Sequence, residues 1–119
     1  MLARSFMSAT ELRISEAEYA ALIKTLFAFE RNEIQPEQFD MREWCGTAAC
    51  ICGHAQHFSP DVFNGQMFSW PYGLRALFAP PDSELPEKIA YEDIKPKDAA
   101  VAISNYLTTG EPHWNEVLS

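Results

Sequence analysis

Residues 39–57 hold most of the side chains in this chain that could do chemistry. The three cysteines and two of the three histidines lie there: Cys45, Cys50, Cys52, His54 and His57. Thiolate and imidazole are the usual ligands of zinc and related transition metals. On a helix, Cys50, His54 and His57 at positions i, i+4 and i+7 share one stripe. A fourth ligand would come from Cys45 or His113, so the first hypothesis is a transition-metal site.

A reactive thiol is the second chemical hypothesis. Cys45 stands just before a predicted helix, whose positive N-terminal end favours a thiolate. Such a nucleophile needs a base within hydrogen-bond reach and a third group that orients the base. In the C-terminal segment, His113 would be the base, and Asn115 or Glu116 would orient it. By residue types alone, without the local sequence that surrounds the nucleophile in papain-like enzymes, this set would suit a thiol-dependent hydrolase.

The same segment also has a purely structural explanation. Small residues, Gly46, Ala48, Ala49, Gly53 and Ala55, leave a helix over about 46–58 nearly bare, so neighbouring helices and aromatic rings can approach its backbone. The cysteine and histidine spacing also differs from the usual zinc modules. We therefore expect a packing motif with no bound metal or other cofactor, formed by Trp44, Cys45, Gly46, Thr47, Cys50 and Gly53.

Helical patterns position these residues. Ser15 and Glu18 form a capping box, flanked by Ile14 and Tyr19 as a hydrophobic staple, and apolar residues then recur at helical spacing. Thr47 is a candidate N-cap of the central helix, and Gly110 a C-terminal stop. Lys95 is a poor cap before Pro96. The predicted helices cover about 16–32, 46–58, 72–78 and 96–108.

The connectors are predicted to be irregular. Ser59-Pro60-Asp61 begins one short turn that ends near position 65, and residues 80–94 carry at most one extended stretch, at 89–91. Trp44 and Trp114 are expected to be buried, and the C-terminal segment is expected to fold back because Trp114 and Leu118 are poor candidates for free solvent. In the central helix, one side should face the core: Ala48, Ile51, Cys52, Ala55 and Phe58. We predict a mainly α fold, a single domain over 1–119 around this central helix, with residues 1–10 disordered.

Charge and composition narrow the function. Nine Lys and Arg against 17 Asp and Glu give a net charge of −8. Nucleic-acid binding relies on Lys and Arg that neutralise phosphates, so it is not expected. No stretch is long and apolar enough for a membrane span or a secretory leader, which favours the reducing cytoplasm. The acidic surface favours a protein partner with basic charge.

The segment Phe39-Asp-Met-Arg-Glu-Trp-Cys-Gly-Thr-Ala-Ala-Cys-Ile-Cys-Gly-His-Ala resembles a family of small, uncharacterised bacterial and bacteriophage proteins. Their pattern is an aromatic lead-in, then Cys-Gly-Thr-x-x-Cys-x-x-Gly-(Trp or His)-Ala. They tend also to have a segment like Leu77-Phe-Ala-Pro80 and a last helix leading to Thr109-Gly-Glu-Pro112. Cys52 stands where the family usually has Ala, and His54 where it accepts Trp. The resemblance therefore implies that Cys52 is a small-residue packing position, and it argues against a metal or catalytic role for His54.

The resemblance implies no activity, and two classes of function remain. The first is a non-enzymatic interaction protein, of the kind encoded by mobile elements, that modulates another protein. In one version it inhibits a host defence nuclease by offering carboxylates where nucleic acid would bind. The second is a thiol- or zinc-dependent hydrolase that uses Cys45 or Cys50 with His54, His57 or His113.

Overall fold

A computed structural model of the chain describes residues 6–35, 37, 39, 51–59, 63, 70–79 and 94–118. These residues form six helices and no strand: α1 (Ala9–Leu12), α2 (Glu16–Glu30), α3 (Ile51–Phe58), α4 (Tyr72–Phe78), α5 (Pro96–Thr109) and α6 (Trp114–Val117). The prediction of a mainly α fold is confirmed. Several sequence predictions concern positions outside the described residues: the Thr47 cap, the burial of Trp44, the turn begun by Pro60 and the connector 80–93.

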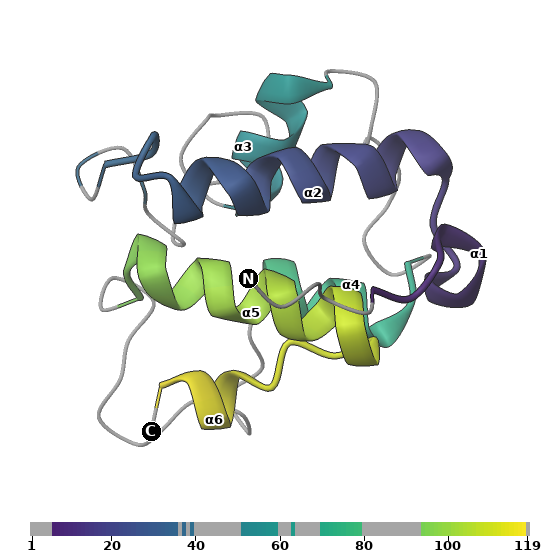
Figure 1. Ribbon diagram of the computed structural model, residues 1–119. Coiled ribbons are helices and arrows are strands. Elements are labelled where there is room, and N and C mark those ends of the chain that lie inside the picture. The colour runs from purple at the N-terminus through teal and green to yellow at the C-terminus, as the bar shows by residue number, and fades with distance from the viewer. Residues whose placement is uncertain are drawn as a thin grey trace.

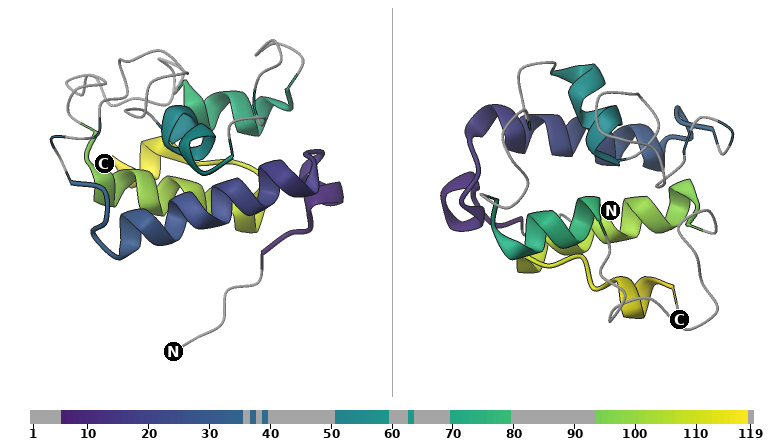
Figure 2. Two further views of the ribbon diagram at one scale, coloured as in Figure 1. Left: turned by 90° about the horizontal axis from the view of Figure 1, so that it is seen from above. Right: turned by 180° about the vertical axis from the view of Figure 1, so that it is seen from behind.

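The two long helices form the axis of the fold (Figure 1). α2 and α5 lie side by side and run in opposite directions, and α3 crosses α2. Figure 2 shows that α3 and α4 lie on the same side of this pair, while α6 lies against α5 on the side away from α2. The helices that carry the candidate site residues, α3 and α6, therefore sit on different parts of the molecule.

Reciprocal capping begins the first two helices. Glu18 N–H donates to Ser15 Oγ at 3.1 Å, and the Glu18 carboxylate accepts from Ser15 N–H at 2.8 Å. This is the predicted capping box, and it satisfies two backbone donors that a helix start otherwise leaves without partners. Ser8 and Glu11 repeat the arrangement at α1. That single-turn helix was not predicted, and it includes Ala9 from the segment expected to be disordered.

Left-handed residues follow the ends of α2 and α5. α2 was predicted to reach position 32 but ends at Glu30, because Asn32 has φ 59°. Its N–H donates to Phe29 O at 3.2 Å, and Glu33 N–H donates to Ala28 O at 2.9 Å, which is a Schellman motif. α5 ends one residue later than predicted, and Gly110 stops it as expected, with φ 89°.

The core surrounds the first residues of α3. Residues 51–55 are all buried, and Ile51, Cys52 and Ala55 have no exposed surface, as predicted. The prediction that Phe58 shares this buried side is wrong, since 38% of it is exposed. Phe58 is the last residue of α3, and its ring lies beside that of the exposed His57. An aromatic cluster joins α4 to the rest of the core through edge-to-face contacts among Phe63, Trp70 and Phe78.

The backbones of α4 and α5 meet at two glycines. A Cβ placed on Gly73 would collide with the carbonyl oxygen of Gly110 and would lie 2.9 Å from its carbonyl carbon. Such an approach is possible only without a side chain. The contact sets the position of α4 against the C-terminal end of α5, where the C-terminal segment begins.

Trp114 fixes the C-terminal segment. Its side chain is fully buried, as predicted, and its indole N–H donates to Ala76 O at 2.7 Å. Asn105 Nδ2 donates to Pro112 O at 3.0 Å, which attaches the same segment to α5. The segment is therefore held by α4 and α5 together, and His113 lies between these two anchors.

Candidate functional site

His54 is buried in the core. The sequence placed it with Cys50 and His57 on the side of α3 opposite the core. Instead only 7% of His54 is exposed, and its ring lies 5.8 Å from the ring of Phe29 and 6.4 Å from that of Phe39. Phe39 thus lies over the side of α3 that was expected to face solvent.

The two α3 histidines lie in different environments. His57 is exposed, and its ring contacts Phe58 at 5.8 Å between centroids. Cys52, the one cysteine among the described residues, is a buried free thiol. Within the described part of the chain, no three Cys, His, Asp or Glu side chains gather closely enough to hold a metal ion. Cys50, the third member of the hypothetical metal stripe, lies outside that part.

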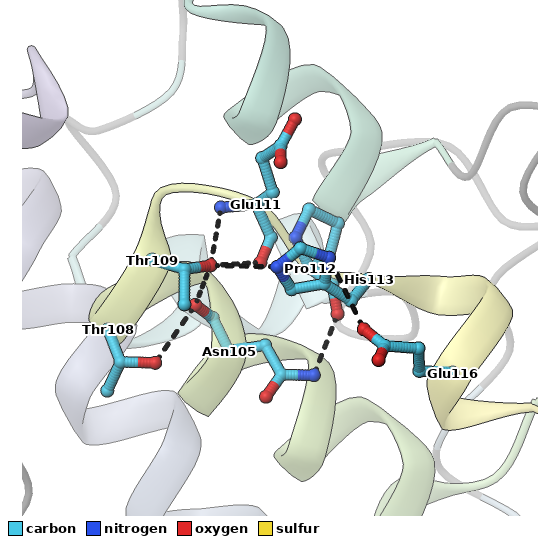
Figure 3. Close-up of polar contacts among 7 residues, drawn as sticks. All are labelled: Asn105, Thr108, Thr109, Glu111, Pro112, His113 and Glu116. Carbon is cyan, nitrogen blue, oxygen red and sulfur yellow. Dashed lines mark hydrogen bonds and ion pairs between the residues drawn. The ribbon is translucent and has the colours of Figure 1, made fainter.

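His113 sits in a chain of polar contacts at the end of α5 (Figure 3). Its Nε2 is 3.1 Å from Thr109 Oγ1, and its Nδ1 is 3.5 Å from Glu116 Oε2. The backbone of His113 is left-handed, with φ 54° and ψ 50°, as N-cap of α6. This conformation turns the ring back toward α5 while Glu116 approaches from the first turn of α6. The structure thus brings His113 to Glu116, one of the two orienting residues suggested by the sequence.

Thr109 was not identified from the sequence, yet it is the centre of this chain of contacts. Its Oγ1 lies 2.8 Å from Asn105 O and 3.0 Å from Glu111 O, and it accepts from Glu111 N–H at 3.2 Å. A hydroxyl has one proton, so the two carbonyls compete with His113 for it. Thr109 thereby closes the end of α5 and the turn that follows.

Hydroxyl, imidazole and carboxylate follow one another in the order that nucleophilic catalysis uses. Two features favour a structural role instead. The Thr109 hydroxyl is occupied by backbone groups, and Thr109 and Glu116 are both exposed, so bulk water surrounds the chain of contacts. These contacts hold the C-terminal segment against α5. Cys45, which His113 was proposed to serve as a base, lies outside the described residues, as do Trp44, Gly46 and Thr47.

A buried tyrosine is a feature that sequence analysis missed. The Tyr106 side chain is almost fully buried, and its hydroxyl has no hydrogen-bond partner among the described residues. Burial, and secondarily the negative charge of Glu18, raises the pKa of this phenol above its usual value. Helical periodicity can indicate that a tyrosine faces the core, but it does not indicate whether the hydroxyl of that tyrosine is hydrogen-bonded.

Comparison with known proteins found no matching family model, no matching curated protein and no matching solved structure. The resemblance to the bacterial and bacteriophage family therefore rests on the quoted motif and stays a prediction. None of the helices that the structure describes is long and apolar enough to cross a membrane.

Proposed function

We propose that this chain is a non-enzymatic interaction protein that binds and modulates another protein in the cytoplasm. Its proposed origin is a bacterium or bacteriophage, on the basis of the Cys-Gly-Thr motif. No cofactor takes part. The support comes from two properties: the way aromatic side chains are presented on the surface, and the acidic balance of the chain.

Exposed aromatic side chains carry the proposal. Tyr72 on α4 is 53% exposed, and the Arg75 guanidinium lies 5.8 Å from its ring centre. Phe27 on α2 is 37% exposed, and Arg31 lies 5.4 Å from its ring centre. Aromatic and arginine side chains are the ones that most often dominate binding at protein interfaces. We call these the two aromatic–arginine pairs.

The acidic balance supports a basic partner. Nine of the 17 acidic residues and six of the nine basic residues belong to the described part of the chain. An excess of carboxylates speeds association with a positively charged surface and repels nucleic acid. In the narrower version of the proposal, the partner is a host defence nuclease whose phosphate-binding surface receives these carboxylates.

Affinity capture with matched variants tests the proposal. Phe27→Ser and Tyr72→Ser each remove one exposed ring, and Ala17→Ser is the control because it alters an exposed residue of α2 without an aromatic group. The parent and the control should retain the same partner from a bacterial lysate, and both aromatic variants should retain much less of it. Capture should also weaken as salt rises, because salt screens surface charges.

Two results would contradict the proposal. One is equal capture by the parent and by both aromatic variants, provided that circular dichroism shows an unchanged fold. The other is a partner interaction that does not depend on ionic strength. For the nuclease version, the captured partner should lose activity when the purified chain is added, and its nucleic acid should compete with the chain.

One observation supports the second candidate, a thiol- or zinc-dependent hydrolase: Glu116 approaches His113 as an orienting group would. If His113 activates Cys45, His113→Gln should slow the alkylation of Cys45 by iodoacetamide, measured with Cys50 and Cys52 replaced by Ser. Unchanged alkylation would exclude that base. Zinc at one equivalent, lost in His57→Ala, would instead support the metal version.

A further inference from the structure

The cavity between the end of α2 and the start of α5 differs in charge from the chain as a whole. It has a volume of about 190 Å³ and is lined by Asn32, Ile34, Gln35, Lys95, Pro96 and Lys97. Figure 1 shows that α2 ends and α5 begins on the same side of the molecule, and the lining residues come from these two ends. A cavity of roughly 150 Å³ accommodates a benzene ring, so this one has room for a six-membered ring.

The wall combines apolar surface with positive charge. Ile34 is buried, and the Pro96 ring is partly buried, so these two residues offer apolar surface. Lys95 and Lys97 are exposed, and no hydrogen bond or ion pair within the described structure engages their ammonium groups. None of the lining residues is acidic, although acidic residues outnumber basic ones by 17 to nine in this chain.

Local hydrogen bonds keep this shape in place. Gln35 Nε2 donates to Asn32 O at 2.6 Å, inside the turn that ends α2. On the opposite wall, Lys95 N–H donates to Asp98 Oδ2 at 3.1 Å. Asp98 does not line the cavity, so Lys95 and Lys97 are the charged residues of its wall.

We propose that this cavity binds a small organic carboxylate with an apolar ring. The ring lies on Ile34 and Pro96, and the carboxylate lies between the ammonium groups of Lys95 and Lys97. The ligand needs both the ring and the carboxylate. Contact with the apolar wall removes the carbon surface of the ring from water, and the lysines donate charge-assisted hydrogen bonds to the carboxylate. This site is independent of the proposed interaction function and of the aromatic–arginine pairs.

NMR titration of the purified chain tests the site, with the methyl groups of Ile34 as reporter. The probes are benzoate, its neutral analogue benzamide, and inorganic phosphate, which has charge but no ring. Benzoate should give saturable shifts at Ile34, and the other two should bind more weakly. A result in which phosphate binds as tightly as benzoate would overturn the proposed ligand class.

Matched lysine variants test the role of charge. Lys95→Gln and Lys97→Gln should each weaken benzoate binding about two- to five-fold, the usual effect of one exposed ion pair. Lys24→Gln removes the same charge from the exposed surface of α2 and should leave the affinity unchanged. No saturable shift with benzoate, or equal affinities in Lys24→Gln and in the double variant Lys95→Gln/Lys97→Gln, would overturn the proposal.

Discussion

Adding one methyl group to Gly73 should destabilise the fold. In Gly73→Ala the new Cβ would overlap the carbonyl oxygen of Gly110 and lie 3.4 Å from Tyr106 Cε1. The ring atom could shift, but the carbonyl is backbone. It is held because Gly110 N–H donates to Tyr106 O at 2.8 Å and Gly110 ends α5 in a left-handed conformation.

The net effect can be worked out from two opposing contributions. Overpacking a tight site costs about 1–3 kcal/mol, and a backbone neighbour places Gly73→Ala near the upper limit. Alanine stabilises a helix interior by about 1 kcal/mol relative to glycine, which offsets part of this. We therefore expect the free energy of unfolding to fall by about 2 kcal/mol.

Urea denaturation followed by far-UV circular dichroism measures this change. Gly110→Ala is the matched control: the nearest atom to its added Cβ is the Met7 sulfur at 3.9 Å, so the penalty comes only from φ 89°. Its expected cost is about 1 kcal/mol, smaller than that of Gly73→Ala. If Gly73→Ala unfolds at the same urea concentration as the parent, the close approach of α4 to α5 does not exist as described.

Three further changes test the core and the C-terminal segment. Tyr106→Phe should raise the free energy of unfolding by about 1 kcal/mol, because it removes a buried hydroxyl without a partner. The pKa of Tyr106 is raised in the folded chain, so the unfolded chain loses the phenol proton at a lower pH than the folded chain does. The free energy of unfolding should therefore fall above about pH 10 in the parent, and it should fall less in Tyr106→Phe. An identical alkaline profile in the two proteins would contradict the burial of this group. Trp114→Ala should lower the free energy of unfolding by about 3–5 kcal/mol, whereas Trp114→Phe, which loses mainly the hydrogen bond to Ala76, should lower it by about 1–2 kcal/mol in the same denaturation assay. Gly53→Leu should cost about 1–3 kcal/mol through overpacking of buried α3, and an unchanged melting temperature would show that this helix is peripheral.

Local sequence patterns predicted α2, α4, α5 and the end of α3 well because their signals act over a few residues. The Ser15–Glu18 capping box, Pro96 at the first turn of α5 and Gly110 after its last turn each specify a boundary within one turn of helix. The same capping signal was present at Ser8 and Glu11, but α1 is one turn long and has no hydrophobic periodicity to draw attention to it. The early end of α2 was not predicted, because the left-handed conformation of Asn32 depends on the turn that follows the helix.

The arrangement of the site depended on contacts that periodicity does not report. The helical angles of α3 separate two sides, but they cannot show that Phe39 covers the side of His54 while Phe58 is left exposed. The proximity of His113 and Glu116 was suggested by their spacing of three residues. The contact of His113 with Thr109, in contrast, requires the chain to reverse at Gly110. The hydrogen bond from Trp114 to Ala76 joins residues that are 38 positions apart, so no local pattern indicates it.

The pairing of α2 with α5 has a consequence for how the chain folds. The 65 residues between Glu30 and Pro96 include α3 and α4, so the main helix pair forms only when a long loop closes. The loss of chain entropy on closure precedes the gain from packing, and proteins with such distant contacts fold more slowly than helical bundles with local contacts. Stopped-flow refolding should therefore be slow for an all-helical chain of this length. A cut in the loop between α3 and α4 should leave two fragments that each hold only one of the long helices.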